Sequence, residues 1–421
     1  MSAQRKDKPG LVAFRYSNFR WYWIGQLSTN IGTWMQMVAT GWLVLQLTNS
    51  PVALGLNSAF QAVPMIFFTF FGGVIGDRVD RFKLLVLNQA VRIVPDVLLA
   101  YLVASGKCTV ADVYIYSLFS AVVNGLTTPG RQAMVPRLVP ATAMLSAIAL
   151  SSTVWQGAAV VGPSLAGIIL AAWGLPMCFW INAGSDFFNL FTLFFLRLAP
   201  EAEGRRAASA WNSLVEGLHY LGHPGPVRTI LLTVTCVNVF GRAYQQLLPV
   251  FAQDVFRTGP TGLGLMTSMP AVGAVGASVI LATLAGRNLI RWFMAGTALV
   301  GVALVGFALT PNFLVALGLL ILVGGATSAV STLSSTMLQQ MVEDRMLGRI
   351  YSFQIAGAQG GSKLGVLPAG ILAQVATPGL AILASALILL AVLMPALRSS
   401  SLRLVPPRRE PEPVPIPVLS S

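Results

Sequence analysis

The sequence predicts an all-α membrane protein whose roughly twelve transmembrane helices form two six-helix bundles. Hydrophobic residues make up 55% of the 421 residues and charged residues only 10%, whereas about 25% of the residues in a soluble domain are charged. Apolar windows long enough to span a bilayer, about 20 residues each, recur from residue 20 to residue 397. The longest polar interruption, at 199–227, leaves six windows before it and six after it.

Short connections rich in glycine, proline and charge separate the predicted spans. The spans cover residues 20–46, 53–75, 83–104, 111–131, 145–171, 176–197, 228–251, 262–285, 292–310, 313–338, 350–373 and 379–397. The first 18 residues are charged and polar and hold no apolar core. We therefore expect no cleaved signal peptide and a first span that stays in the mature protein.

The spacing of the spans divides the chain into four segments. We expect an N-terminal bundle at 1–198, a cytoplasmic linker at 199–227, a C-terminal bundle at 228–398 and a tail at 399–421. In the linker, apolar residues recur at helical spacing, which predicts an amphipathic helix on the membrane surface; they are Trp211, Leu214, Leu218 and Leu221. The tail is rich in proline and lacks an apolar period, so we expect it to be disordered.

The positive charge of the chain is distributed as a topology signal. The net charge is +13, and lysine and arginine concentrate before the first span, in every second connection and after the last span. The alternate connections at 47–52, 173–175, 311–312 and 374–378 contain neither. Because positive residues stay inside, this asymmetry predicts a multi-pass protein of the cell membrane with both termini in the cytoplasm. It also argues against nucleic-acid binding, since the charges form no single basic face.

The sequence holds no motif for a metal, a cofactor or a catalytic centre. The three cysteines, Cys108, Cys178 and Cys236, are isolated and match no CxxC or Cys/His spacing. An enzyme would need a catalytic constellation, and the sequence has no HExxH, GxSxG or P-loop. We therefore predict a protein without enzyme activity, metal or cofactor, and prefer a transporter over a membrane enzyme or a receptor-like scaffold.

The connection between the second and third spans carries the most specific motif. Residues 72–83 read GGVIGDRVDRFK, where glycines permit close helix contact and a carboxylate among arginines can form contacts that differ between two states. The segment resembles the signature of the major facilitator superfamily, which reads roughly G-x-x-x-D-R-x-G-R-R at this place. The resemblance implies a conformational switch on the cytoplasmic side, built from Gly73, Asp77, Arg78 and Arg81.

Other segments indicate a subfamily of exporters. Asp80 stands where much of the superfamily has glycine, and here the chain resembles the enterobactin exporters and macrolide efflux proteins. In the fifth span, GPSLAG at 162–167 resembles the G-P-x-x-G-G motif of exporters, with Ala166 in place of one glycine. Gly162 and Pro163 are further switch candidates, because small residues allow tight packing and proline bends a helix. An ordinary glycine-rich helix contact is the alternative.

The resemblance implies a monomeric secondary transporter of a small molecule, such as a siderophore, a drug or a metabolite, in the bacterial inner membrane. The sequence has no ATP-binding domain, so transport would use an ion gradient or the gradient of the substrate itself. We expect an efflux antiporter that works by alternating access, with a proton as the coupling ion. An uptake symporter or a facilitator of the same fold is the alternative, because residue patterns do not set the direction of transport.

Charged residues inside the predicted spans need partners, because an isolated charge there costs about 2.5 to 3.5 kcal/mol. They are Arg92, Asp96, Asp186, Arg242 and Lys363. Arg92 and Asp96 are four residues apart, which favours an ion pair within one helix. Asp186 shares a helical stripe with Asn182 and Asn189, which fits either a proton carrier or a hydrogen-bonded helix contact. Asp186 and Asp96 are our proton-coupling candidates, although the resemblance places the third and sixth helices at the periphery.

Polar stripes on the helices that the resemblance assigns to the central cavity supply the substrate-binding candidates. They are Gln26, Asn30, Tyr114, Asn124, Asn238, Arg242, Gln245 and Lys363. The cavity spans contribute two cations, Arg242 and Lys363, but no midmembrane carboxylate. This charge imbalance predicts a substrate that is anionic or rich in hydrogen-bond acceptors. The alternative is that these side chains bond neighbouring helices, or that the two cations reach carbonyls or the membrane surface.

Overall fold

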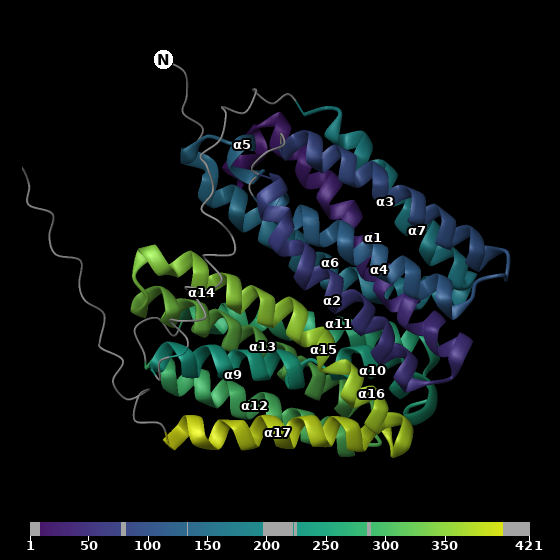
Figure 1. The fold of residues 1–421 in the computed structure, drawn as a ribbon, viewed down its shortest axis with the longest axis vertical. Helices are drawn as coiled ribbons and strands as arrows, with labels where there is room; N and C mark the ends of the chain where they lie inside the picture. The colour runs from purple at the N-terminus through teal and green to yellow at the C-terminus, as the bar shows by residue number, and fades with distance from the viewer. Residues whose placement is uncertain are drawn as a thin grey trace, which may run out of the picture.

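The computed structural model describes residues 9–76, 81–132, 134–196, 222, 225–283 and 288–398. Within these residues the chain forms helices and turns and no strand, as predicted (Figure 1). The predicted linker helix, the proline-rich tail and the switch residues Asp77 and Arg78 lie outside the described residues.

Among the described residues, the N-terminal bundle has one long helix for each predicted span. These are α1 (Ser17–Thr48), α2 (Pro51–Gly76), α3 (Arg81–Ala104), α4 (Val110–Gln132), α6 (Met144–Trp173) and α7 (Leu175–Leu193). The short helix η1 (Pro9–Arg15) precedes α1, and α5 (Val135–Leu138) and η2 (Ala141–Ala143) lie between α4 and α6. Asn49 ends α1 in the left-handed conformation, with a φ of 48°. Pro51 then starts α2, where its missing N–H leaves no helical bond unmade.

The C-terminal bundle combines continuous and interrupted spans. The continuous helices are α11 (Gly259–Thr283), α12 (Leu289–Leu309), α13 (Phe313–Met341) and α17 (Pro378–Arg398). The predicted span 228–251 consists of α9 (Pro226–Gly241), α10 (Tyr244–Val250) and the following π-helical turn η3 (Phe251–Val255). The predicted span 350–373 consists of α14 (Asp344–Ala356), the π-helical turn η4 (Gly357–Gly361), α15 (Ser362–Leu364) and α16 (Val366–Val375).

The sequence analysis did not predict the interruptions of these two spans, and close glycine contacts accompany the second one. A Cβ atom at Gly365 would overlap the carbonyl of Val239, and one at Gly357 would lie 2.8 Å from Thr235 Oγ1. This part of the chain therefore passes close to α9. A π-helical turn adds a residue to the helix there, as is common at functional positions in helices.

The two bundles meet at one end of the molecule. Between the bundles, α6 packs on α11 and α2 packs on α15 and α16. Figure 1 shows the bundles side by side where α10 and α16 lie, and diverging toward the end that carries α5 and α14. Within the bundles, α1 packs on α6 and α7, and α11 packs on α13.

By length and apolar composition alone, several described helices contain a stretch that can cross a membrane. They are α2, α3, α6, α11, α12 and α13. Shorter apolar stretches lie in α4, α15 to α16 and α17. α1 and α7 do not reach this hydropathy because each carries a row of polar residues, and the two helices pack against each other. The buried polar side chains are therefore concentrated at a contact inside the N-terminal bundle.

Candidate functional site

The polar faces of α1 and α7 lie against each other. On α1, buried residues at helical spacing form one row: Gly25, Thr29, Gly32 and Gln36. On α7, the buried polar residues are Asn182, Ser185, Asp186, Asn189 and Thr192. A Cβ atom at Gly25 would overlap the Thr192 hydroxyl, and one at Gly32 would overlap the Ser185 hydroxyl. The two glycines thus bring the helices close enough for hydrogen bonds between them.

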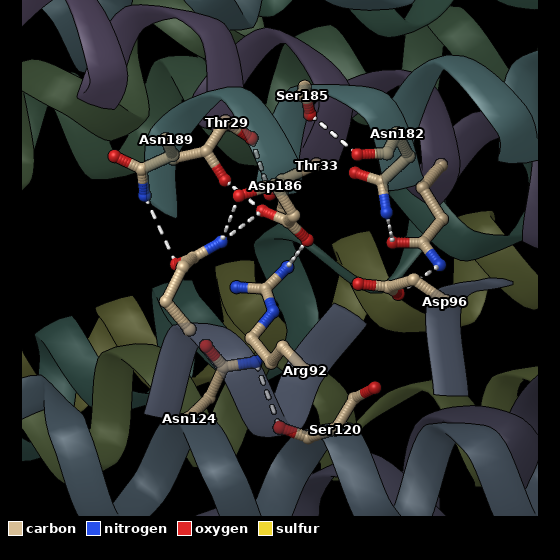
Figure 2. Close-up of polar contacts among 12 residues, drawn as sticks. Thr29, Thr33, Arg92, Asp96, Ser120, Asn124, Asn182, Ser185, Asp186 and Asn189 are labelled. Carbon is tan, nitrogen blue, oxygen red and sulfur yellow. Dashed lines mark hydrogen bonds and ion pairs between the residues drawn. The ribbon is translucent and has the colours of Figure 1, made fainter. Parts of the chain in front are cut away.

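Asp186 is the most fully partnered charge in this contact (Figure 2). Its side chain is 0% exposed, and Arg92 Nη2 lies 3.4 Å from its Oδ2 atom as an ion pair. The Thr29 hydroxyl and the Gln89 amide both donate to its Oδ1 atom, the latter at 2.8 Å. Donors from α1 and α3 together with a guanidinium therefore hold Asp186 as a carboxylate.

The predicted ion pair within α3 does not form, which corrects our interpretation of Arg92 and Asp96. Among the described residues, Arg92 pairs with Asp186 of α7. Helical spacing allows the pair with Asp96 but does not require it. The packing of α7 on α3 places a carboxylate opposite Arg92, so the ion pair joins two helices.

Asp96 has a different set of contacts. The Tyr116 hydroxyl donates to its Oδ1 atom at 2.6 Å, and Gln36 Nε2 reaches the same atom at 3.4 Å. Gln36 in turn accepts a hydrogen bond from Asn182 Nδ2 at 2.9 Å. In the described part of the chain, Asp96 Oδ2 is buried and has no hydrogen-bond partner. One carboxyl group of the network therefore lacks a cation of its own.

Four residues of this network escaped sequence analysis, namely Thr29, Gln36, Gln89 and Tyr116. Gln89 also accepts from Asn189 Nδ2 at 3.1 Å, so it links the stripe on α7 to α3. Its signal was available in the sequence, because Gln89, Arg92 and Asp96 share one face of a helix at i, i+3 and i+7. Tyr116 and Gln36 had no such signal, since their importance depends on α4 and α1 lying beside α3.

The substrate candidates of the N-terminal bundle make contacts within that bundle. The Tyr114 hydroxyl donates to the Ala53 carbonyl at 3.2 Å, which holds α4 on α2. Asn30 donates to the Gln26 carbonyl at 2.6 Å within α1, and Asn124 donates to the Ser120 carbonyl at 2.9 Å within α4. These bonds fit the alternative of structural roles, and substrate binding by these residues stays a prediction.

The candidates on α9 and α10 surround the break between these helices. Asn238 donates to the Val234 carbonyl at 2.8 Å, while its Oδ1 atom is buried without a partner among the described residues. Arg242 follows α9 directly, and its side chain has no hydrogen bond or ion pair to any residue in the described ranges, although Nε is buried. The backbone N–H of Gln245 donates to the Arg242 carbonyl at 3.1 Å.

Lys363 lies at the contact between the bundles. Its Nζ atom donates to Gln61 Oε1 of α2 at 2.7 Å. At the same end, Ser50 donates to Gln374 at 2.7 Å. Lys363 therefore has a protein partner across the two bundles, in contrast to Arg242.

The small residues of α6 lie at two different contacts. A Cβ atom at Gly162 would lie 2.7 Å from Trp34 Cβ of α1, inside the N-terminal bundle. The carbonyl of Pro163 and Gly167 instead lie against Gly264 of α11, in the other bundle. The remaining switch candidates, Gly73 and Arg81, lie at the end of α2 and the start of α3, and the proposed switch role of all these residues stays a prediction.

Known proteins match the chain over most of its length. The family described as "Transmembrane secretion effector" matches residues 9–409. The staphyloferrin A transporter of Staphylococcus aureus is 25% identical over 328 residues, which cover 76% of this chain and 81% of that protein. The enterobactin exporter EntS of Shigella boydii is 25% identical over 363 residues, which cover 86% of each.

A solved structure shares the fold. The crystal structure of a bacterial homologue of the human lysosomal transporter Spinster, in an inward-facing and unoccupied conformation, aligns with a TM-score of 0.68 at 14% sequence identity. The alignment covers 92% of this chain and 93% of that chain.

Proposed function

The chain belongs to the transmembrane secretion effectors, a family of major facilitator transporters, and we propose that it exports a small anionic molecule in exchange for protons. It is a multi-pass membrane protein and a secondary transporter, not an enzyme. The family carries small molecules, and two relatives are named for staphyloferrin A and enterobactin. The direction of transport, the charge of the substrate and the identity of the coupling ion are what we propose beyond this.

The observation that carries the proposal is that the bundles lie side by side at one end and diverge toward the other (Figure 1). The hydrogen bond between Ser50 and Gln374 joins two connections without lysine or arginine, 47–52 and 374–378. The hydrogen bond between Asn49 and Gln253 lies beside a connection whose only positive residue is Arg257. By the positive-inside rule this end faces out, and both termini face the cytoplasm of a bacterial cell. In this orientation the bundles are in contact at the outer side and diverge toward the cytoplasm. Alternating access requires such an inward-facing state as one of its two conformations.

Arg242 supports an anionic substrate. Arg242 is half-buried, and a cation in a membrane protein without a hydrogen bond or ion pair is costly unless water or a ligand compensates it. Arg242 sits where α9 ends, and the described residues provide neither a carboxylate nor a carbonyl for its side chain. Lys363 already bonds Gln61 and is better placed to join the bundles. We therefore assign the recognition of substrate charge to Arg242 and treat the protein as a monomer with one central site.

Transport in everted membrane vesicles tests this function. With the vesicle interior acidic and no ATP, the wild-type protein should accumulate an anionic iron chelator from a panel that also holds a neutral compound and a lipophilic cation. Arg242→Gln should lower anion accumulation by about tenfold or more, while the matched control Arg242→Lys, which keeps the charge, should retain most of it.

Two outcomes would overturn the proposal. Equal accumulation of the lipophilic cation by wild type and Arg242→Gln, with no anion moved, would exclude an anionic substrate. Accumulation only in right-side-out vesicles with an acidic exterior would identify an uptake symporter of the same fold.

A further inference from the structure

Asp96 is a buried carboxyl group whose charge the neighbouring residues do not balance. We propose that Asp96 takes up and releases the coupling proton and that Gln36 transmits the change to α1; this rests on the proton coupling proposed above. In this step one proton binds Asp96 Oδ2 and converts the carboxylate into a neutral carboxylic acid. No other bond forms or breaks.

The charged and titratable groups that face Asp96 in the described chain come from three helices. Arg92 lies one turn earlier on α3, Asp186 comes from α7 and Tyr116 from α4, whereas α1 presents the neutral Gln36. Arg92 is paired with Asp186, so its positive charge is already balanced. Asp96 is only 2% exposed, and an unbalanced carboxylate at that depth is costly. One added proton makes the group of Arg92, Asp186 and Asp96 neutral.

The hydrogen bonds of Asp96 leave one of its oxygens for this proton. Oδ1 accepts from the Tyr116 hydroxyl at 2.6 Å and from the Gln36 amide at 3.4 Å. Oδ2 is buried, and none of the residues that the structure describes donates to it. A buried carboxylate oxygen without a donor loses its hydration without compensation. Protonation at Oδ2 removes the negative charge from this buried group and leaves the bonds at Oδ1 in place.

Asp186, the other candidate from sequence, is less suited to this role. Its Oδ2 atom also lacks a hydrogen bond among the described residues, but Arg92 Nη2 lies 3.4 Å from that atom as an ion pair, and Oδ1 accepts from Thr29 and Gln89. A proton on Asp186 would displace its ion pair and leave Arg92 as a buried cation. Of the two proton-coupling candidates, the geometry therefore favours Asp96, for which sequence analysis had favoured an ion pair with Arg92.

Gln36 connects Asp96 to the contact between the bundles. Its amide nitrogen reaches Asp96 and the Tyr116 oxygen, and its amide oxygen accepts from Asn182 of α7. Further along α1, Gly41 faces the C-terminal bundle, since a Cβ atom there would lie 3.2 Å from Pro249 Cγ of α10. A shift of Gln36 on protonation therefore acts on α1 at its contact with α7, and the same helix contacts α10 at Gly41.

Infrared spectroscopy of the full-length protein in lipid tests the proton site without any substrate. The wild type should show the absorption of a protonated carboxyl group that disappears as the pH rises. Asp96→Asn should abolish this titrating signal, while Asp254→Asn, which changes an exposed carboxyl group on η3, should retain it. A signal that persists in Asp96→Asn and is lost in Asp186→Asn would overturn the proposal.

A second variant keeps the test valid if Asp96→Asn does not fold. Tyr116→Phe retains the carboxyl group and removes only the hydroxyl that donates to it, so the midpoint of the titrating signal should move by about one pH unit. An unchanged midpoint would contradict the assignment to Asp96.

Transport assays separate this inference from the proposed function. Asp96→Asn should lower pH-driven accumulation by about tenfold or more, yet retain exchange of substrate between equal concentrations, which needs no proton movement. Unimpaired pH-driven accumulation in Asp96→Asn would count against the proton site. If the infrared signal belongs to Asp96 and no compound of the panel is transported, the proposed function fails and the proton site stands.

Discussion

The contact of α1 with α7, inside the N-terminal bundle, and the contact of α6 with α11, between the bundles, have different chemistry. α1 and α7 are joined through hydrogen bonds to Asp186 and Gln36, and Asp186 also holds the ion pair with α3. α6 and α11 approach through Gly167 and Gly264, with a hydrogen bond of 2.8 Å between Ser164 and Ser268.

This difference separates a contact that should persist from one that should open. Separation of α1 from α7 would leave buried polar groups and a charge without partners, at a large cost in lipid. Separation of α6 from α11 exposes small residues and backbone, which lose mainly dispersion contacts that water or lipid can replace. The N-terminal bundle can therefore move as one body while its contact with the other bundle forms and breaks.

The largest expected effect is on stability and concerns Arg92. Arg92→Met leaves the Asp186 carboxylate buried and unpaired, so the free energy of unfolding should fall by about 3 to 5 kcal/mol. Thermal unfolding of the purified protein in detergent measures this change.

The double variant Arg92→Met with Asp186→Leu provides the control, because it removes both charges and should recover most of the loss. If Asp96→Leu, and not Asp186→Leu, restored the stability of Arg92→Met, the ion pair would lie within α3. That result would contradict an ion pair that joins α3 to α7.

A smaller effect, on the balance between conformations, is expected from Gly264→Leu. A Cβ atom at Gly264 would lie 2.5 Å from the Pro163 carbonyl, and overpacking of this kind costs about 1 to 3 kcal/mol. The closed end should open, so a cysteine introduced at Leu367, which faces Gly55 across the bundles, should become reactive toward an impermeant thiol reagent added outside.

Gly276→Leu on the same helix is the matched control, because a Cβ atom at Gly276 would meet no atom of the described residues within 4 Å. Both variants require a background without Cys108, Cys178 and Cys236. Equal labelling of Leu367→Cys in the two variants would show that the α6–α11 contact does not hold the closed state.

The smallest effect is expected from Ser268→Ala. This change removes the hydrogen bond to Ser164 across the bundles, worth about 0.5 to 1.5 kcal/mol, so labelling at the same reporter should rise only a few-fold. Ser278→Ala is the control, since among the described residues Ser278 bonds only the Ala274 carbonyl of its own helix, at 2.9 Å. If Ser268→Ala raised the labelling of Leu367→Cys more than Gly264→Leu did, the hydrogen bond, and not the close backbone approach, would be the main contact that holds the bundles closed.

Sequence patterns predicted individual helices well where the pattern is local. The span predicted at 292–310 is α12 (Leu289–Leu309), and the span predicted at 379–397 is α17 (Pro378–Arg398). The stripe of Asn182, Asp186 and Asn189 was also correctly placed on one face of a helix. The interrupted spans were not predicted, because the close approach of Gly365 to Val239 depends on a neighbouring helix.

The sequence by itself determined the class of the molecule, because apolar length, helical period and the position of positive charge each depend on neighbouring residues in the chain. Only the tertiary structure decided which charges meet. Arg92 pairs with Asp186 instead of Asp96, and Lys363 bonds Gln61, which is 302 residues away. In a bilayer these choices follow from which helices pack side by side, since a buried polar group must find its partner on an adjacent helix.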